Sequence, residues 1–372
     1  MQIKVCHLTS VHPINDVRIF VKQCTSLAAN GFDVTLIACG DTAYEDIQNG
    51  VKRISLNVPI KSRLQRMRKR SKAVLRKAIE IDSDIYHLHD PELIAIGLYL
   101  SKRGKIVIYD AHEDLPLQML SKPYLNGLSR RIFSILTNLY LKYACSKLSA
   151  VVTATPKIES KFNTFTRKVV NINNFPILDE FSLVQHVWSS KSKQVCYIGG
   201  FSQTRGIKEI VSAMSLVQGE VRLSLGGCFN EPGFDSLVKS LPGWSSVDNL
   251  GFLDRAGVSK LLSNSYAGLV TLHPTQNYID SLPVKMFEYM AAGLPVIASN
   301  FPLWKEIIEV HNCGICVDPT KPEEIANAID LLVSNPELAR EMGENGKRAV
   351  NEKFNWKSEE KKLIDLYESL LK

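Results

Sequence analysis

The stretch Asp280-Ser-Leu-Pro-Val-Lys-Met-Phe-Glu-Tyr-Met-Ala-Ala-Gly-Leu-Pro295 contains a helix start, a helix end and two carboxylates. Ser281 is a candidate N-cap, and Pro283 suits the first turn, where its missing N–H costs nothing. Good helix formers follow, and Gly293 with the proline after it ends the helix. A strand over residues 295–299 is expected directly after the helix.

The same stretch could bind an anion. A helix start offers unpaired backbone N–H groups and the positive end of a dipole, which together favour a phosphate. Asp280 lies just before this start and Glu288 about two turns into the helix, so their carboxylates could hold hydroxyl groups on either side of a phosphate. The spacing alone leaves open an amphipathic core helix with a charged end.

The stretch resembles the signature of glycosyltransferase family 4, retaining enzymes with the GT-B fold. The usual pattern is Glu-Gly-Phe-Gly, four residues, then Glu-Ala-Met-Ala-x-Gly-x-Pro-Val, and residues 288–296 match its second half closely. In the first half, Asp280 replaces the first Glu. The resemblance implies that Glu288 holds the ribose of the nucleotide and that Asp280 contacts the donor sugar as a catalytic residue. The residues that replace Gly-Phe-Gly beside the donor are Ser281, Leu282 and Pro283.

A second loop, from Gly199 to Lys208, has the composition of a phosphate-binding loop. Its glycines let the backbone approach a phosphate, and Arg205 supplies a fixed positive charge. The loop resembles the family motif Gly-Arg-x-x-x-x-Lys-Gly, with Gly200 in place of the Arg and Arg205 in place of the Lys. One of the two cations of the family is therefore missing from its usual place. We expect Arg205 to stabilise the leaving diphosphate, alone or with Lys208.

Two further loops of the second half are expected at the donor. Phe252 and Leu253 follow a strand in the region that, by the resemblance, lines the nucleobase through backbone groups. Asp254 beside them could instead be an ordinary helix cap. His273 ends another strand just before the signature, where it either lines the donor or is an ordinary loop histidine.

In the first half, His112 follows a strand. A histidine at the carboxyl end of a parallel strand can exchange a hydrogen bond with a reacting sugar. The family has a histidine at the corresponding strand end, near the bond that is broken, although a lone histidine is more often structural. Glu113 is expected on the acceptor side. Asp16 is either a helix cap or, with Arg18, part of a site for an anionic acceptor.

Metal binding is not expected. His87 and His89 alternate along a strand beside acidic residues, but no firm third ligand accompanies them. Cys313-x-x-Cys316 is the only C-x-x-C of the chain and lacks a second pair, which disfavours zinc. Several of the eight cysteines lie in apolar, strand-like runs, as in a reduced cytoplasmic protein. No cofactor is implied beyond a nucleotide diphosphate sugar as donor substrate.

Strand and helix signals alternate along the chain, which predicts parallel sheets flanked by helices. A chain of 372 residues is too long for one ordinary core, and a break rich in Asn, Ser and Pro falls near residues 173–193. The expected strands cover residues 3–8, 32–37, 85–88, 105–109, 150–153, 169–172, 194–198, 221–225, 247–250, 268–272, 295–298 and 314–317.

With the resemblance, this pattern predicts an α/β protein of the GT-B fold, in which two Rossmann-like domains face a central cleft. The acceptor-binding domain is expected at 1–180 and the nucleotide-sugar-binding domain at 190–355. A helix over 356–372 is expected to cross back to the N-terminal domain.

The net charge of +7 is concentrated at residues 61–77, which hold nine Lys and Arg and no acidic residue. The run could be a solvated helix face or could contact an anionic membrane surface, at about 1 kcal/mol per basic residue. Nucleic acid is not expected, because no aromatic residue interleaves with the basic ones. No apolar run is long enough for a transmembrane helix, and the N-terminus resembles a strand rather than a signal peptide. A cytoplasmic location follows, with peripheral contact to the inner face of the membrane as an option.

The resemblance therefore predicts a metal-independent hexosyltransferase that moves a sugar, with retention, from a nucleotide diphosphate sugar to a glycan or lipid-linked acceptor. The loop at residues 10–20 resembles bacterial polysaccharide-assembly transferases, which suggests cell-surface polysaccharide synthesis. An epimerase or hydrolase on the same fold remains an alternative. Because Gly200 and Asp280 depart from the family pattern, a non-catalytic nucleotide-sugar-binding subunit is a second alternative. The basic run at residues 61–77 makes a membrane tether a third.

Overall fold

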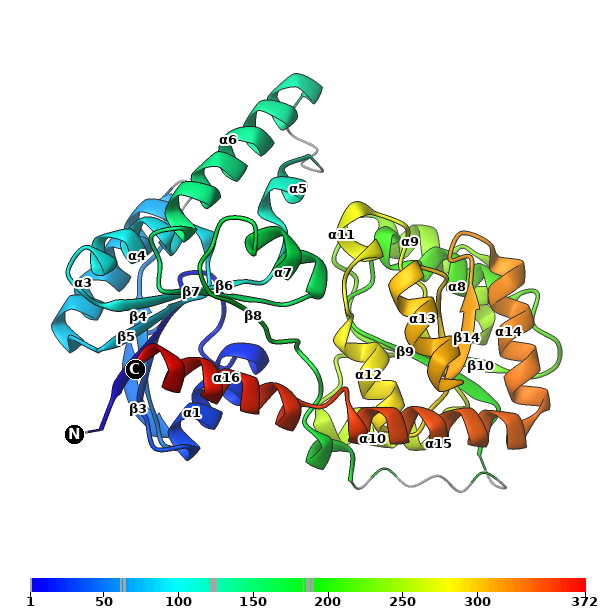
Figure 1. Ribbon diagram of the computed structural model, residues 1–372. Helices are drawn as coiled ribbons and strands as arrows, with labels where there is room; N and C mark the ends of the chain where they lie inside the picture. Colours follow the sequence, from blue (N-terminus) through cyan, green and yellow to red (C-terminus); the bar gives the residue numbers. More distant parts are fainter. Residues whose placement is uncertain are drawn as a thin grey trace. The chain divides into compact units, whose positions relative to one another are not determined.

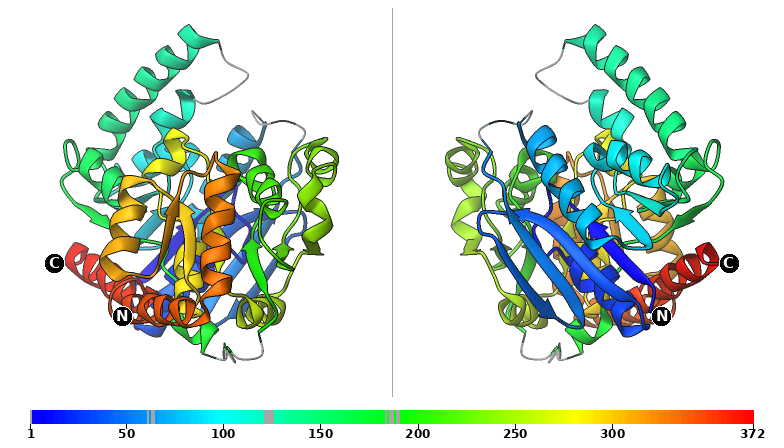
Figure 2. Two further views of the ribbon diagram at one scale, coloured as in Figure 1. Left: turned by 90° about the vertical axis from the view of Figure 1, so that its right-hand side faces the viewer. Right: turned by 90° about the vertical axis from the view of Figure 1, so that its left-hand side faces the viewer.

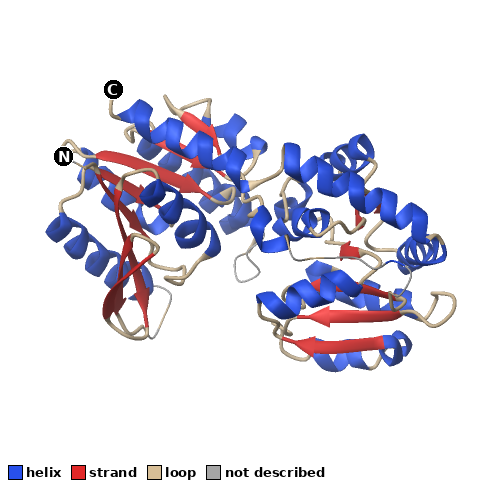
Figure 3. Ribbon diagram, turned by 90° about the horizontal axis from the view of Figure 1, so that it is seen from below, coloured by secondary structure: helices blue, strands red, loops and turns tan. Residues whose placement is uncertain are grey.

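The computed structural model describes residues 2–60, 62, 65–120, 126–182, 184, 188 and 191–372, which form two compact units. The N-terminal unit comprises Met1–Asn174 with Lys357–Lys372, and the C-terminal unit comprises Phe175–Trp356. Each unit has its own sheet flanked by helices (Figure 3). The predicted basic run lies partly outside the described residues, at Lys61 and Arg63.

The N-terminal unit is built on a sheet whose described strands follow the order β3-β4-β2-β1-β5-β6-β7-β8. Figure 1 labels β3 to β8 of this sheet. Neighbouring strands pair in parallel, except that β3 is antiparallel to β4. The bounds are β1 Lys4–Leu8, β2 Asp33–Gly40, β3 Tyr44–Gln48, β4 Val51–Asn57, β5 Ile85–Leu88, β6 Ile106–Ala111, β7 Ala150–Thr153 and β8 Val169–Asn171.

The first helical segment of this unit begins after Asp16, whose Oδ1 accepts hydrogen bonds from the N–H groups of Arg18 and Ile19, each at 2.9 Å. The capping prediction for Asp16 is confirmed. The segment ends before Gly31, whose φ of +88° suits glycine. The helix bounds are η1 Val17–Cys24, α1 Thr25–Ala29, η2 Arg66–Arg70, α3 Ser71–Ile81, η3 Pro91–Leu93, α4 Ile94–Ser101, α5 Leu115–Leu120, α6 Gly127–Cys145 and α7 Pro156–Phe162.

The last helix, α16 (Trp356–Leu370), packs on the N-terminal unit. The hydroxyl of the buried Tyr367 lies 2.7 Å from Nδ1 of His87 and 3.2 Å from Nε2 of His7. The N–H of Asn173 donates to Oε2 of Glu359 at 2.7 Å. These contacts confirm the prediction that the C-terminal helix returns to the N-terminal domain.

The C-terminal unit has a parallel sheet whose described strands follow the order β11-β10-β9-β12-β13-β14. Its strands are β9 Gln194–Ile198, β10 Arg222–Gly226, β11 Val247–Gly251, β12 Gly268–Val270, β13 Val296–Ser299 and β14 Gly314–Val317. Its helices are η4 Leu178–Phe181, η6 Gln203–Arg205, α8 Ile207–Met214, α9 Phe234–Lys239, η7 Pro242–Ser246, α10 Arg255–Asn264, α11 Gln276–Ile279, α12 Val284–Ala291, α13 Pro302–His311, α14 Pro322–Ser334 and α15 Pro336–Glu352.

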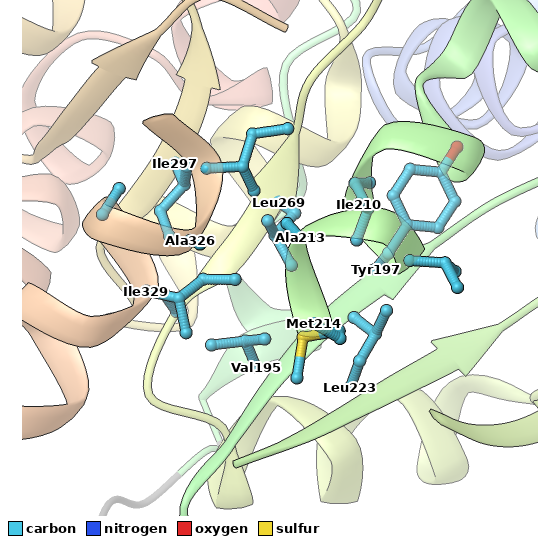
Figure 4. Packing of buried hydrophobic residues seen from close by; sticks show 14 of the residues in the cluster. Val195, Tyr197, Ile210, Ala213, Met214, Leu223, Leu269, Ile297, Ala326 and Ile329 are labelled. Atoms are coloured by element: carbon cyan, nitrogen blue, oxygen red, sulfur yellow. The ribbon is translucent and has the colours of Figure 1, made fainter. Parts of the chain in front are cut away.

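Both faces of this second sheet are buried, as expected of a parallel sheet covered by helices. Val195 and Tyr197 of β9 pack with residues of α8 and α14 (Figure 4). Cys196, between them, belongs to the other face, together with Met286 and Phe287 of α12. The signature helix is therefore fixed against the sheet by its apolar side.

No helix among the described residues is long and apolar enough to cross a membrane.

Candidate functional site

The signature stretch forms a turn followed by α12. Asp280 lies directly after α11, half-buried, in the turn that leads to Val284. The hydroxyl of Ser281 donates to the carbonyl of Tyr278 at 2.9 Å, and Pro283 occupies the N-cap position. The prediction that Ser281 caps the helix is therefore wrong, because its hydroxyl is engaged with the preceding helix.

The glycine loop, residues 199–206, approaches neighbouring backbone very closely. Gly199 has a φ of +134° and its N–H donates to the carbonyl of Gly226 at 2.9 Å. A β-carbon on Gly227 would lie 1.9 Å from the carbonyl oxygen of Gly199. A β-carbon on Gly200 would lie 2.1 Å from Nδ2 of Asn230, so an arginine in its place would require Asn230 to move.

Two cations converge on this loop. A β-carbon on Gly199 would lie 3.3 Å from Nη1 of Arg205 and 2.8 Å from Nζ of Lys285. Nη1 of Arg205 also donates to the carbonyl of Gly200 at 3.4 Å. We call Arg205 and Lys285 the cation pair. Sequence reasoning missed Lys285, which lies in the first turn of α12 and belongs to neither half of the signature pattern.

The ammonium nitrogen of Lys285 is buried, and none of the described residues accepts a hydrogen bond from it. It lies 3.9 Å from the centre of the Tyr197 ring, a cation–π contact. Burial, with the nearby Arg205, lowers the pKa of Lys285 to about 7, although Glu288 acts in the opposite direction. Two neighbouring cations of which one is buried and unpaired form a site suited to an anion.

Glu288 lies on the same helix as Lys285, three residues later. Its side chain is about a quarter exposed, and its Oε1 lies 3.7 Å from Nη1 of Arg255, which is also 3.1 Å from Oε2 of Glu180. These are half-exposed ion pairs, which contribute little to stability. Glu288 is also near enough to Lys285 to act on its pKa, so this helix brings a carboxylate close to the cation pair.

The remaining donor-side candidates differ in their surroundings. His273 is half-buried, and its Nε2 lies 2.9 Å from Oε2 of Glu209 on α8. Lys208 is exposed at the start of the same helix. Phe252 is 85% exposed, whereas Leu253 is half-buried and packs on the C-terminal core. The exposed ring of Phe252 offers a stacking surface for a planar group.

Asp254, next to Leu253, accepts a hydrogen bond from the N–H of Gly257 at 2.8 Å and caps α10. The capping alternative for this residue is confirmed.

In the N-terminal unit, His112 follows β6 and is half-buried. Its Nε2 lies 3.3 Å from Oδ2 of Asp110, which is fully buried at the end of the strand. Asp110 also accepts a hydrogen bond from Nε2 of Gln23 at 2.8 Å and two from Arg18, at 2.9 and 3.1 Å. Burial acts to raise the pKa of Asp110, but Arg18 and His112 hold it well below its usual range. Asp110 is thus an ionised carboxylate beside the ring of His112.

The acceptor-side candidates are placed as follows. Arg18 is 5% exposed, and its guanidinium is matched by Asp110 and by the carbonyl of Ile172 at 3.0 Å. This placement gives Arg18 a structural role rather than the predicted contact with an anionic acceptor. Asp16 caps its helix and lies 3.4 Å from Nδ1 of His12. Glu113 is exposed beside His112.

A buried histidine cluster lies under this site. His7 on β1 stands in register with His87 on β5, and nitrogens of His7, His87 and His89 lie within 4.8 Å of one another. The expectation that His87 and His89 lack a third potential ligand is therefore wrong. The rings of His87 and His89 stack at 17°, however, so their in-plane lone pairs do not converge on one ion. His7 Nδ1 instead bonds His89 Nε2 at 2.9 Å, and the cluster links the sheet to Tyr367.

Nitrogen and oxygen atoms of His89, Asp110 and His112 form a second group of this kind. Asp110 is already neutralised by Arg18, which leaves little negative charge for a cation.

Two family models match the chain. The model for "Glycosyltransferase Family 4" matches residues 17–175, and the model for "Glycosyl transferases group 1" matches residues 179–349. Among individual proteins, the chain is similar to MJ1069 of Methanocaldococcus jannaschii, an uncharacterized glycosyltransferase, at 23% identity over 203 residues. This match covers 54% of this chain and 51% of that protein. The chain thus spans about half the length of this relative, and 44% of a second, MJ1607 of the same organism.

Two solved structures share the fold over their full length. Sucrose-phosphate synthase (tll1590) from Thermosynechococcus elongatus has a TM-score of 0.76 at 19% identity, over 100% of this chain and 99% of that one. Anabaena Alr3699/HepE in complex with UDP-glucose has a TM-score of 0.71 at 15% identity, over 99% and 100%. With a family model on each half and the same fold throughout, the chain belongs to glycosyltransferase family 4 and has the GT-B fold.

Proposed function

We propose that the chain transfers a sugar from a nucleotide diphosphate sugar to an acceptor. The observation that carries the proposal is the convergence of Arg205 and Lys285 on Gly199, with Glu288 on the same helix as Lys285. A diphosphate needs positive charge and close backbone approach, and a ribose needs a hydrogen-bond acceptor. The binding of UDP-glucose by HepE, which has the same fold, supports a donor of this class.

In the proposed reaction, the bond between the anomeric carbon and the diphosphate breaks and leaves an oxocarbenium-like sugar. Arg205 and Lys285 stabilise the charge that develops on the departing diphosphate. Glu288 holds the ribose, Asp280 holds hydroxyls of the sugar, and the backbone at Ser281, Leu282 and Pro283 lines the donor. Phe252 and Leu253 border the nucleobase. His273, whose Nε2 contacts Oε2 of Glu209, lines the donor. Lys208, exposed on α8, remains an auxiliary candidate.

In the N-terminal unit, we assign His112 to the reacting centre, with the carboxylate of Asp110 beside its ring. Glu113 is the proposed contact to the acceptor, and Asp16 acts through the loop that it caps. A glycan or lipid-linked acceptor, hexosyl transfer with retention and a role in cell-surface polysaccharide synthesis complete the proposal. These finer assignments rest on the family resemblance, as do metal-independent chemistry and a cytoplasmic location at the membrane.

A donor screen tests the proposal. The melting temperature is measured with UDP-, GDP- and ADP-sugars, because a ligand that binds only the native state raises it. We expect one nucleotide class to raise the melting temperature in the wild type and to fail in Glu288→Ala. Release of nucleoside diphosphate that depends on an added acceptor would establish transfer. Equal release without acceptor would indicate a hydrolase, and binding without any release would indicate a non-catalytic subunit.

A further inference from the structure

Helix α6 (Gly127–Cys145) carries its large apolar side chains on the outside. Leu128 is 71% exposed, Ile135 61%, Tyr143 59% and Leu139 56%. Soluble helices normally turn such residues towards the core. The exposed large apolar residues of α6 are Leu128, Ile132, Phe133, Ile135, Leu136, Leu139, Tyr140 and Tyr143.

These side chains share one face of the helix. Leu128, Ile132, Ile135, Leu139 and Tyr143 follow one another at steps of four, three, four and four residues, the spacing of a single helical stripe. We call this stripe, with the other exposed apolar residues of α6, the α6 apolar face. The helix runs out beyond the sheet of its own unit (Figures 1 and 2).

The other side of α6 is the one that packs. The hydroxyl of Ser134 donates to the carbonyl of Pro116 on α5 at 2.9 Å, and Leu141, Ala144 and Cys145 are buried. The orientation of α6 is therefore fixed by contacts within the unit, and the α6 apolar face is left outside by the fold itself.

Basic residues accompany the α6 apolar face. Arg131 and Lys142 are both exposed and lie eleven residues apart, close to three helical turns, so they flank the same edge of the stripe. The sequence has no Asp or Glu between residues 115 and 158, which include α5 and α6. An apolar stripe with cations along its edge and no acidic residue nearby is complementary to an anionic lipid surface, whose interior is apolar and whose headgroups carry negative charge.

We propose that α6 lies flat on an anionic lipid surface. The α6 apolar face enters the boundary between headgroups and acyl chains, and the aromatic rings of Phe133, Tyr140 and Tyr143 suit that depth. Arg131 and Lys142 reach the lipid phosphates from the edge of the stripe. A second copy of the chain fits this face less well, because pairing two α6 helices would bring like charges together without an acidic partner on either helix. The proposal stands on α6 alone and does not depend on the transferase assignment.

Co-sedimentation with vesicles tests the proposal. The wild type is expected to bind phosphatidylcholine vesicles that contain about 30 mol% phosphatidylglycerol, and to bind pure phosphatidylcholine vesicles much more weakly. The double variant Leu136→Ser, Leu139→Ser should reduce the partition constant at least about tenfold. The matched control is Ile47→Ser with Val310→Ser, which removes two apolar residues of 77% and 73% exposure elsewhere and should leave binding unchanged.

A charge variant separates α6 from the basic run. Arg131→Gln with Lys142→Gln should lower binding about fivefold per charge, and added salt should lower wild-type binding in the same direction. Arg68→Gln with Lys69→Gln removes two exposed cations of the basic run and should have less effect.

Three results would overturn the proposal. The first is that both α6 variants bind like the wild type. The second is that only the basic-run variant loses binding. The third is that the wild type is a dimer by sedimentation velocity and Leu136→Ser, Leu139→Ser makes it a monomer, which would assign the face to a second copy. Far-ultraviolet circular dichroism and the melting temperature confirm that each variant is folded.

Discussion

The ammonium nitrogen of Lys285 lies 3.9 Å from the centre of the Tyr197 ring, at the start of the glycine loop. The aromatic face offers this lysine partial compensation for burial but no hydrogen bond. The ammonium group of Lys285 therefore lies near Arg205 without a hydrogen-bond acceptor among the described residues. We expect the donor diphosphate to be the anion that accepts hydrogen bonds from it.

With UDP as the probe, chosen because HepE binds UDP-glucose, Lys285→Met should weaken binding by about tenfold or more. A charge-assisted hydrogen bond contributes about 1.5–3 kcal/mol. The variant should not be less stable than the wild type, because it removes a buried ammonium that has no hydrogen-bond acceptor among the described residues. Titration calorimetry with UDP measures the first effect and urea unfolding the second. Lys305→Met on α13, an exposed lysine of the same unit, is the matched control and should bind UDP normally. Unchanged affinity in Lys285→Met would remove this lysine from the site.

The affinity for UDP-glucose should depend on pH through Lys285. Its pKa in the free protein is about 7, so the ammonium loses its proton as the pH rises through neutrality, and the neutral amine no longer pairs with a diphosphate. Binding should therefore be strong near pH 6 and weaken progressively towards about pH 9. UDP-glucose is the probe because its diphosphate carries constant charge over this range. The slope should disappear in Lys285→Met, and a wild-type affinity independent of pH would contradict the assignment.

Glu288→Ala should abolish transfer while the protein remains folded. The ion pair that it removes is loose and half-exposed, so the cost in stability should be below about 1 kcal/mol. Nucleotide release and the melting temperature are measured together. Glu180→Gln removes the other carboxylate that faces Arg255 and should keep most of the activity. Full activity in Glu288→Ala would exclude this carboxylate from the reaction.

Gly227→Ala should lower both stability and UDP affinity. Its β-carbon would lie 1.9 Å from the carbonyl oxygen of Gly199, so the glycine loop must shift relative to the cation pair. Gly233→Ala is the control, because it has a φ of +76° with nothing within 4 Å and should cost only the backbone term, about 1–2 kcal/mol. If the two variants have the same stability and the same UDP affinity, the close approach of Gly227 to Gly199 is not required for UDP binding.

Asp110→Asn should destabilise the N-terminal unit by about 3–5 kcal/mol, because it leaves the buried guanidinium of Arg18 without its counter-charge. The double variant with Arg18→Met should be less destabilised than the sum of the two single changes. Denaturant unfolding of all four proteins gives the coupling. The exposed pair Arg222 and Asp248 provides a control cycle, whose coupling should lie within about 1 kcal/mol.

The sequence was a good guide where strands are buried on both faces. Apolar runs such as Val195–Ile198 predicted the strands, and β9 has the predicted bounds Gln194–Ile198. The other expected strands are also present. The hairpin of β3 and β4 was missed. Every residue of β3 is exposed, so its side chains carry no apolar alternation, although Asn49 and Gly50 form its turn with positive φ.

The candidate site was only partly predictable, for a physical reason. Capping and loop composition are local, and they identified Asp16 and the glycine loop. The role of Lys285 depends on backbone that is 86 positions earlier in the chain at Gly199, and the pairing of Arg18 with Asp110 joins residues 92 positions apart. Contacts of this kind arise from strand order, which no local pattern in one sequence reveals.

The bond between Tyr367 and His87 joins residues 280 positions apart, across the entire C-terminal unit. During synthesis, the C-terminal unit is therefore complete before the N-terminal unit receives its last helix. Until α16 has been synthesised, the histidine cluster lacks its contacts with Tyr367. Removal of α16 would consequently damage the N-terminal unit, although Phe175–Trp356 separates the two in the sequence.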